Sequence, residues 1–303
     1  MGYQEFLCVV EKNLNQRLEG GVTASVHVTV KNNGKIKQGI LVEDPQVNIS
    51  PTIYLEEFYE RFQNGESLEE ILNSLLKFYE TVRCKQSWDT KEVEQFEEAK
   101  HKIVFKVVHR ERNQELLEQV PHMDLLDLSI LFYVLLDIKE DGTATMLIRK
   151  EHLKLWGIQE KELFPLACAN AIRLLPAQLH AMKDLMEELM NPEGDKPENL
   201  LEHTGTIPQD VMYVLSNPLK NYGAAAFFYG GIMEKIAQLL QGDYYILPSS
   251  VHEMILVPGG AGFDARELTE MVQDVNASQV ELEEQLSNHV YYYDWQKKQL
   301  EMR

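Results

Sequence analysis

Residues 212–258 constrain the fold of this chain more than any other stretch, because short apolar runs alternate there with turn signals at close spacing. Nearly unbroken apolar runs are typical of strands in the middle of a sheet, whereas apolar residues three and four apart indicate a helix. The predicted elements are strands at 212–215 and 224–229, a helix at 232–240 that ends at Gly242, and strands at 244–247 and 251–257. We therefore expect a sheet with this helix packed on one face.

The rest of the chain mixes the same two patterns. Residues 22–30 alternate apolar and polar side chains as a half-buried strand does, and Asn33-Gly34 then predicts a hairpin. Ser67 and Glu70 have the spacing of a helix capping box. The runs that begin at Tyr133 and Tyr213 echo each other, which suggests two strand–strand–helix units. We predict an α+β protein with a mixed or antiparallel sheet and amphipathic helices packed on it.

The chain is long enough for one large domain or two modest ones, since it has 303 residues. Residues 191–208 hold prolines and glycines and few apolar side chains, so they are the best candidate for a loop or linker. This divides the chain into an N-terminal α+β region at 1–190 and a C-terminal α+β region at 209–303, which together can also form one continuous domain.

Composition and charge limit the function classes. With 44% hydrophobic and 25% charged residues the chain resembles a water-soluble globular protein, and no apolar run is long enough to span a bilayer. A net charge of −19 disfavours nucleic acid as a partner. Cys8, Cys84 and Cys168 are odd in number and far apart, and the N-terminus does not have the pattern of a signal peptide, so we expect free thiols in a reducing cytoplasm.

The first candidate site is the group Ser250, His252 and Glu253. A histidine beside a glutamate and two residues after a serine could serve as an acid–base pair or activate a nucleophile. If residues 251–257 form a strand, however, His252 and Glu253 point to opposite faces, and only Ser250 and His252 share one. The simpler interpretation is that His252 and Ser250 bind backbone groups of the turn, and we favour it.

The second candidate is the charged cluster of His109, Arg110 and Arg112 at the end of a predicted strand. Arginines there could bind a carboxylate or phosphate of a ligand through two parallel hydrogen bonds. The alternative, which we favour, is that the two arginines pair with nearby acids at the surface, namely Glu111, Glu115 or Glu118.

Other patterns are weaker. The nine histidines are not spaced as metal ligands, so we expect no metal site and no cofactor. The glycines at 259–262 precede a helix, but Asp264 occupies the capping position where a phosphate would bind, so we interpret this run as a connector.

Several segments together resemble a known family. They are PTIYLEEFYERF, HRERNQELLEQVPHMDLLDLSILFY, YVLSN, GAAAFFYGGIMEKIA and YYILPSSVHEMILVP, and the resemblance extends from about Tyr54 to Pro258. They are similar to the family called domain of unknown function 5688, found mainly in gut Firmicutes. The resemblance implies a bacterial cytoplasmic protein and one continuous module, and it implies no catalytic residue.

The sequence thus favours a non-catalytic binding or interaction module, whose partner is a protein or a small molecule. The alternative is a hydrolase-like enzyme that uses Ser250 and His252. Convergence of these side chains with His109 or Glu253 in one deep pocket would favour the enzyme.

Overall fold

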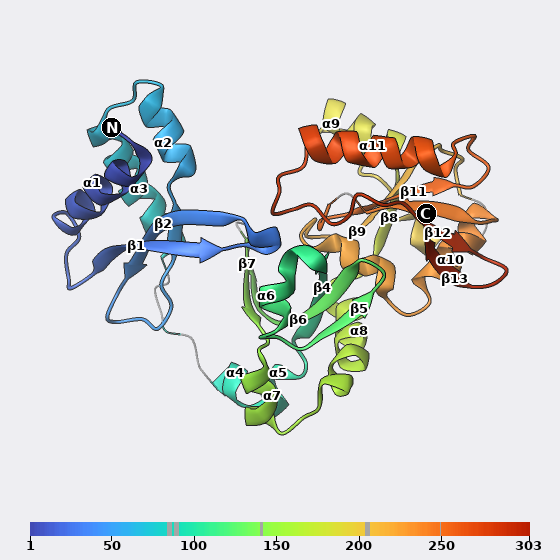
Figure 1. Cartoon of the computed structure of the whole chain (residues 1–303), viewed down its shortest axis with the longest axis horizontal. Helices are drawn as coiled ribbons and strands as arrows, with labels where there is room; N and C mark the ends of the chain where they lie inside the picture. The colour runs from blue at the N-terminus through green and yellow to red at the C-terminus, as the bar shows by residue number, and fades with distance from the viewer. Residues whose placement is uncertain (84–86, 88–90, 140–141, 204–206, 249) are drawn as a thin grey trace. The chain divides into compact units, whose positions relative to one another are not determined.

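A computed structural model describes residues 1–303 except 84–86, 88–90, 140–141, 204–206 and 249. The chain forms two compact units, Met1–Thr90 and Lys91–Arg303. All described strand pairs are antiparallel, in three sheets, and helices pack against them (Figure 1). The predicted α+β class is therefore confirmed, with antiparallel rather than mixed sheets.

The first unit is a three-stranded sheet of order β1-β2-β3 with three helices. Its elements are α1 (Tyr3–Asn15), β1 (Thr23–Val30), the 3-10 helix η1 (Asn32–Gly34), β2 (Ile36–Glu43), β3 (Thr52–Tyr54), α2 (Glu56–Gln63) and α3 (Leu68–Val82). Phe6 of α1, Ile40 of β2 and Ile71 of α3 are fully buried in one core. The capping box of Ser67 and Glu70 is present at the start of α3, as predicted.

Strands β1 and β2 form the hairpin that Asn33-Gly34 predicts, with Val30 opposite Ile36 at its end. Asn33 and Gly34 both adopt positive φ, 58° and 71°, which asparagine and glycine tolerate better than other residues. The loop is longer than two residues, because the amide of Lys31 bonds the carbonyl of Lys35 at 2.7 Å and so closes it.

The second unit contains the other two sheets. Its strands are β4 (Ile103–His109), β5 (His122–Leu125), β6 (Leu128–Lys139), β7 (Gly142–Leu147), β8 (Gln178–Ala181), β9 (Tyr213–Ser216), β10 (Tyr244–Leu247), β11 (Met254–Pro258), β12 (Tyr291–Asp294) and β13 (Gln299–Met302). Its α-helices are α4 (Lys91–Glu94), α5 (Phe96–Ala99), α6 (Gln114–Leu117), α7 (Lys150–Trp156), α8 (Leu163–Leu174), α9 (Met182–Met190), α10 (Ile232–Leu240) and α11 (Ala265–Ser278). Its 3-10 helices are η2 (Glu111–Asn113), η3 (Glu160–Glu162), η4 (Leu200–Glu202) and η5 (Gly223–Phe228).

One sheet has six strands in the order β13-β12-β10-β11-β9-β8, and in the other β6 pairs with β4, β5 and β7. A single core joins the two sheets: Phe105 of β4 lies 5.6 Å from the rings of both Phe164 in α8 and Tyr229 after η5, between ring centroids. The twelve-residue β6 is apolar along most of its length because it is buried in the middle of its sheet.

Helices cover both faces of strands β10 and β11. Successive side chains of a strand point to opposite faces, so each helix layer contacts a different set of residues. Leu247 and Val257 pack with Leu268 and Val272 of α11. On the other face, alternate residues of the two strands join the large core with η5 and α10. Both faces of this hairpin are thus buried, which leaves its two ends as the places where functional side chains can reach solvent.

Several predictions for residues 212–258 need correction. Most of the expected strand at 224–229 is instead the 3-10 helix η5, Gly223–Phe228, because a run of Ala and Phe that is buried on all sides has no periodicity to distinguish helix from strand. The residue with positive φ after α10 is Gln241, at 57°, and not Gly242. The echo between Tyr133 and Tyr213 also fails, since β6 continues into a hairpin with β7 whereas β9 continues into η5.

Residues 191–208, expected to be a loop or linker, lie within the second unit. Strand β8 before them and β9 after them pair in the same sheet. Among the three cysteines, Cys8 is exposed and Cys168 half-buried, and both are free thiols; Cys84 lies outside the described residues. Burial raises the pKa of Cys168 to about 11.

Candidate functional site

Ser250, His252 and Glu253 lie in the connection between β10 and β11. The expected strand at 251–257 begins only at Met254, because the backbone before it pairs elsewhere. Ser250 forms a bridge with Gln285, and the amide of Val251 bonds the carbonyl of Glu284 at 2.8 Å. The argument that His252 and Glu253 point to opposite faces of a strand therefore does not apply, and their individual contacts decide what they can do.

The imidazole of His252 is held on two sides. Its Nε2 lies 3.3 Å from Oε1 of Glu284, and its ring stacks on that of Tyr222 with centroids 6.1 Å apart. The Nδ1 atom is buried and has no hydrogen-bond partner among the described residues. Ser250 meets the backbone of His252 instead of its ring: the hydroxyl oxygen accepts a hydrogen bond from the His252 amide at 3.0 Å.

The surroundings of Glu253 shift the pKa of its carboxyl. Burial raises the pKa of its carboxyl, and the charge of Glu284 adds to the rise. The charge of His252 and a side-chain hydrogen bond with Ser250 act in the opposite direction. Burial has the largest effect, so the Glu253 pKa stays above its ordinary value.

The loop between β9 and η5 supports His252 from the side. Lys220 and Tyr222 both adopt positive φ, 48° and 51°, a conformation that costs energy for residues with side chains. Asn217 holds this loop, because its side chain donates to the carbonyl of Asn221 and accepts from the amide of Leu219, both at 3.0 Å. The Tyr222 ring in this loop contacts both His252 and the ammonium group of Lys106, which lies 4.3 Å from the ring centroid.

His109, Arg110 and Arg112 lie where β4 ends and η2 begins. Nδ1 of His109 accepts a hydrogen bond from the Arg112 amide at 3.2 Å, and burial, followed by the charge of Arg112, lowers the His109 pKa. Arg110 and Arg112 contact other residues than the acids Glu111, Glu115 and Glu118 that we expected as their partners. Arg112 donates to Oε1 of Gln285 at 2.9 Å, and Arg110 lies 4.0 Å from Asp124.

The segment Glu284–Ser287 connects both groups of predicted residues. Glu284 pairs with His252, and the side chain of Gln285 binds Arg112 while its backbone pairs with Ser250. Ser287 donates to Asp127 at 2.6 Å. Sequence reasoning missed this segment, because a short polar stretch in a loop carries no periodicity and its partners lie far away in the chain.

His122 does not join this cluster. Its Nδ1 lies 3.2 Å from the carbonyl of Val120, and its Nε2 lies 3.9 Å from Asp124. The predicted residues are thus brought together in part, through Glu284 and Gln285.

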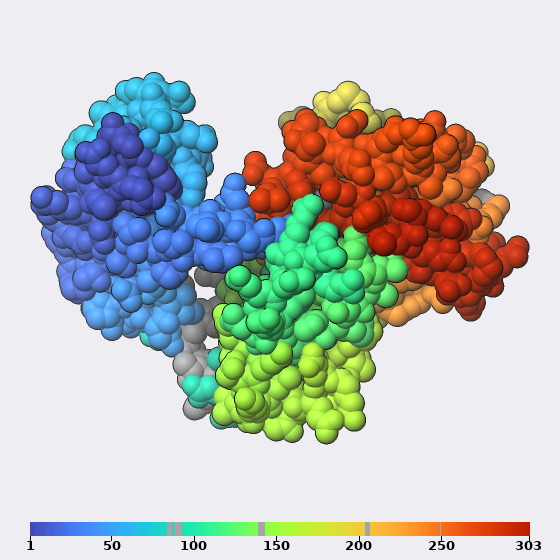
Figure 2. All heavy atoms as spheres, viewed as in Figure 1, coloured from blue at the N-terminus to red at the C-terminus, as the bar shows by residue number. Residues whose placement is uncertain are grey.

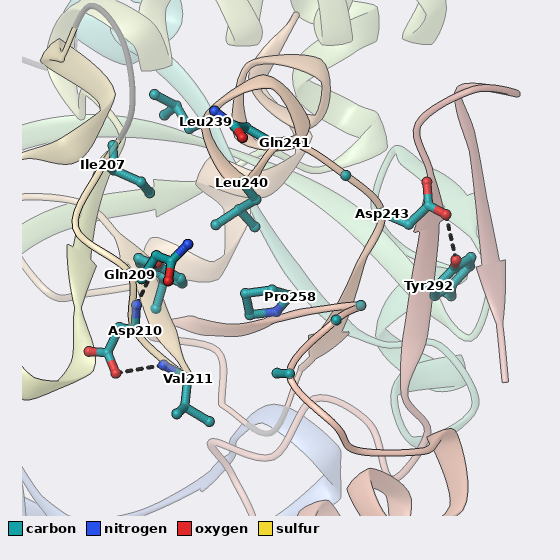
Figure 3. Close-up of a pocket in the computed structure, with 15 residues that line it drawn as sticks. Ile207, Gln209, Asp210, Val211, Leu239, Leu240, Gln241, Asp243, Pro258 and Tyr292 are labelled. Atoms are coloured by element: carbon teal, nitrogen blue, oxygen red, sulfur yellow. Dashed lines mark hydrogen bonds between the residues drawn. The ribbon is translucent and has the colours of Figure 1, made fainter.

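A pocket of about 770 Å³ lies at the opposite end of the β10–β11 hairpin (Figure 3). Its walls come from four segments that are far apart in the sequence. The lining residues are Ile207, Gln209, Asp210, Val211, Tyr213, Leu239, Leu240, Gln241, Gly242, Asp243, Pro258, Gly259, Gly260, Ala261 and Tyr292. The glycine run at 259–262, interpreted as a connector from the sequence, therefore contributes part of the wall.

Asp243 is fixed at one side of the pocket. Its carboxylate accepts hydrogen bonds from the Tyr292 hydroxyl at 2.7 Å and from the Trp295 amide at 2.8 Å. Its carbonyl accepts from the amide of Gly259 at 2.9 Å, and a side chain at Gly259 would meet that same carbonyl oxygen at 3.0 Å. Glycine at this position thus lets the two ends of the hairpin strands approach each other.

Asp210 lies on the other side and accepts from the amides of Val211 and Lys183, at 2.6 and 3.0 Å. Between the two carboxylates, Leu240 and Pro258 present apolar surface, and Gln209 and Gln241 have solvent-exposed side chains (Figure 3). The pocket therefore combines apolar walls, two amide groups and two carboxylates.

The tyrosines of the pocket are neutral at physiological pH. Burial, followed by the hydrogen bond to Asp243, raises the Tyr292 pKa to about 12. Burial also raises the pKa of Tyr213, whose hydroxyl donates to the carbonyl of Pro208 at 2.8 Å. Neither phenol can act as a base there.

Neither a metal cluster nor a membrane-spanning helix is found among the described residues. Within them, no group of three or more His, Cys, Asp or Glu side chains is placed to hold a metal ion. None of the helices in the same part of the chain combines the length and the apolar composition needed to cross a bilayer.

Comparison with known proteins gives one result. No curated protein sequence and no solved structure shows a significant match to the chain. A family model does match, over residues 3–295, which include most of both compact units and all the residues of the turn and the pocket discussed above. The chain accordingly belongs to the Family of unknown function (DUF5688).

Proposed function

We propose that this protein is a non-catalytic binding module, and that the pocket between Asp210 and Asp243 holds a small molecule with an apolar body and no negative charge. The observation that carries the proposal is the composition of the wall. The fifteen described residues around the pocket include two aspartates but no Lys, Arg or His. Such a wall repels phosphates and carboxylates and admits neutral or cationic groups.

The size and the polar groups of the pocket agree with this role. About 770 Å³ is within the range of small-molecule sites, which are mostly apolar with a few polar groups that orient the ligand. The exposed amides of Gln209 and Gln241 offer both donors and acceptors. The carboxylates of Asp210 and Asp243 are held by amides and a hydroxyl, so they can attract a cation without moving.

A hydrolase-like enzyme that uses Ser250 and His252 is the alternative. It requires the serine hydroxyl to donate a hydrogen bond to the imidazole, which then takes its proton. The Ser250 oxygen instead accepts from the His252 amide, and the imidazole faces Glu284. These contacts support a structural role for both residues, and therefore the binding module.

The binding proposal can be tested with three probes that share one apolar body: 2-phenylethylamine, phenylacetamide and phenylacetate. We expect calorimetric titration of the full chain to detect the amine and the amide, with phenylacetate weaker than the amine by about tenfold or more at low salt, because each carboxylate repels it. Equal binding of phenylacetate, or failure of all three to bind, would contradict the proposal.

Two glycine variants locate the binding. Gly260 lines the pocket and a side chain there meets open space, so Gly260→Trp should fill the pocket and abolish binding. Gly230 has the same open surroundings but lies outside the pocket, so Gly230→Trp should bind normally. The enzyme alternative is tested separately with p-nitrophenyl acetate: hydrolysis above background that Ser250→Ala removes would favour it.

A further inference from the structure

The two carboxylates of the pocket lie near opposite ends of two helices. Oδ2 of Asp210 accepts a hydrogen bond from the amide of Lys183, in the first turn of α9, at 3.0 Å. The first turn of a helix carries partial positive charge, which matches this carboxylate. Asp243 instead lies just beyond the C-terminal end of α10, from which only Gln241 and Gly242 separate it. The last turn of a helix carries partial negative charge, so the charge of Asp243 adds to that of the helix end.

Hydrogen bonds fix the Asp243 carboxylate but bring no positive charge to it. Both donors are neutral, namely the Tyr292 hydroxyl at 2.7 Å and the Trp295 amide at 2.8 Å. None of the fifteen described residues that line the pocket is Lys, Arg or His. The wall therefore presents a fixed negative charge on this side, which a cation from solution can balance.

One arginine lies close to this side of the pocket without lining it. The guanidinium carbon of Arg303 is 5.0 Å from the ring centroid of Tyr292, and Nη2 of the same group pairs with Glu301 at 2.9 Å. The C-terminal end of the chain, dark red in Figure 2, lies at the surface of the second unit, and Arg303 is exposed there. Its charge is matched by Glu301 and screened by salt, so it leaves the charge of Asp243 largely unbalanced.

Gln241 has a backbone conformation that favours glycine. Its φ and ψ are 57° and 34°, although Gly242 follows directly and is not among the residues with positive φ. The left-handed conformation costs energy for a residue with a Cβ, and such strain is concentrated at functional sites. The Gln241 side chain is exposed and lines the pocket (Figure 3). Its amide is thus available to a ligand at this end of α10.

We infer that the ligand of the pocket is a primary amine, whose ammonium group lies between Asp243 and the C-terminal end of α10. The inference rests on the proposed function, because it requires the pocket to be a ligand site. A primary ammonium group donates three hydrogen bonds, and this side of the pocket offers the Asp243 carboxylate, the Gln241 amide oxygen and the last carbonyls of the helix as acceptors. The apolar body of the ligand packs against Leu240 and Pro258, which lie between the two carboxylates (Figure 3).

Other cations fit this end of the pocket less well. A guanidinium group binds a carboxylate through two parallel hydrogen bonds, but each oxygen of Asp243 already accepts one bond from the protein. A quaternary ammonium group donates no hydrogen bond and is usually held by a cage of aromatic rings. Among the described lining residues only Tyr213 and Tyr292 are aromatic. A primary amine is therefore the class of cation that these acceptors select.

The inference is tested by calorimetric titration of the full chain with 2-phenylethylamine and 2-phenylethanol, which share one apolar body. We expect the amine to bind about tenfold more tightly at low salt, and this preference to shrink as salt is added. The N,N,N-trimethyl form of the amine should bind more weakly than the amine itself, since it donates no hydrogen bond. Equal binding of amine and alcohol, or tighter binding of the trimethyl form, would overturn the inference and still leave the pocket as a ligand site. Failure of every probe to bind would overturn the proposed function as well.

Asp243→Asn tests the place of the ammonium group. It keeps the shape of the side chain and removes its charge, so the affinity for the amine should fall by about tenfold, to that for the alcohol. Binding of the alcohol by this variant shows that its pocket is intact. Asp210→Asn should reduce the preference for the amine less, because Asp210 already faces the N-terminus of α9. A larger loss in Asp210→Asn than in Asp243→Asn would overturn the inference.

Gln241→Gly gives an independent test, which does not depend on the folding of Asp243→Asn. Glycine adopts positive φ without strain, so this variant should have a higher melting temperature than the parent protein. It should bind the amine about threefold more weakly, because one acceptor is lost. Lys298→Gly is the matched control, since Lys298 has a φ of 52° and is not among the described lining residues. It should also melt at a higher temperature, but bind the amine as tightly as the parent protein. Unchanged amine binding by Gln241→Gly would overturn the placement of the ammonium group at the end of α10.

Discussion

The two ends of the β10–β11 hairpin differ in what surrounds their polar side chains. At the turn, His252 stacks on Tyr222 of a strained loop and pairs with Glu284, and Ser250 forms a bridge with Gln285. At the other end, Asp243 and Gly259 line an open pocket of about 770 Å³. On the proposed function, the same pair of strands has one end that stabilises the unit and another end that takes a ligand.

This difference shows why residue type alone is a poor guide to function here. The turn holds the residues most typical of catalysis, but their contacts are those of a scaffold. The open end holds glutamines, leucines and glycines, which no catalytic motif would single out. The following predictions test the contrast, from the largest effect on stability to the smallest.

Gly223→Ala should have the largest effect. An added Cβ would lie 2.1 Å from Oγ of Ser216, 2.5 Å from the carbonyl oxygen of His252 and 2.9 Å from the amide nitrogen of Asn217. Two of these are backbone atoms that cannot move away, so we expect urea unfolding to show a loss of about 3 kcal/mol. Gly230→Ala, in open space, is the matched control and should change little. A loss of unfolding free energy no larger than that of an ordinary surface substitution would mean that the turn end of the hairpin is not tightly packed.

His252→Ala should have the next largest effect. It removes the pair with Glu284 and the stacking on Tyr222, and it exposes a cavity beside a strained loop. We expect a loss of about 1–3 kcal/mol in the free energy of unfolding. Ser250→Ala serves as the comparison, since it removes only a hydroxyl that accepts one backbone amide. A His252→Ala variant that is as stable as the parent protein, or more stable, would favour the enzyme alternative, because catalytic residues often lower the stability of the folded protein.

Glu253→Gln should have a smaller effect that depends on pH. Burial raises the carboxyl pKa in the folded state, so the folded protein retains a proton that the unfolded chain releases. The stability that Glu253 contributes is fully present below the ordinary glutamate pKa and is lost as the pH rises through the raised value. Glu253→Gln should therefore have a higher melting temperature than the parent protein at about pH 8, and the difference should shrink towards about pH 4. A difference in melting temperature that grows towards acid pH would contradict the raised pKa of Glu253.

Gly260→Trp should have the smallest effect on stability, within about 0.5 kcal/mol, since it adds a side chain to open space. Denaturant unfolding beside Gly230→Trp measures it. The combination of unchanged stability and lost probe binding would mark the pocket as a site for ligands. A large loss of stability would show that this end is as tightly packed as the turn.

Local signals were predictable from the sequence, and contacts between distant segments were not. Ser67 with Glu70 and Asp264 with Glu267 were predicted as caps and are capping boxes in the structure, because each needs only four adjacent residues. Ser278 and Glu281 have the same spacing but form no cap, since Ser278 ends α11 and its hydroxyl donates to the carbonyl of Asp274.

The candidate site was predictable in part for the same reason. His252 and Arg112 attract attention as residue types, but their partners Glu284 and Gln285 are identified only when the chain is folded. The pocket was missed completely, because its walls come from segments near Ile207, Leu239, Pro258 and Tyr292 that no sequence pattern links. Strand prediction failed at η5 for a different reason, since apolar content without periodicity does not specify an extended backbone.

The order of strands in the six-stranded sheet also affects how the protein is made. Tyr291 and Tyr293 of β12 are buried in the core beside β10, and Asp127, more than 160 positions earlier, accepts hydrogen bonds from Ser287 and Tyr291. A nascent chain on the ribosome can form the sheet around β6 long before β12 emerges. Until then Tyr244 and its neighbours lack their cover, and the edge of β10 is exposed to other chains. Completion of the second unit therefore waits for β12, which is synthesised well after β10 and the sheet around β6, so the nascent form is a natural client for chaperones.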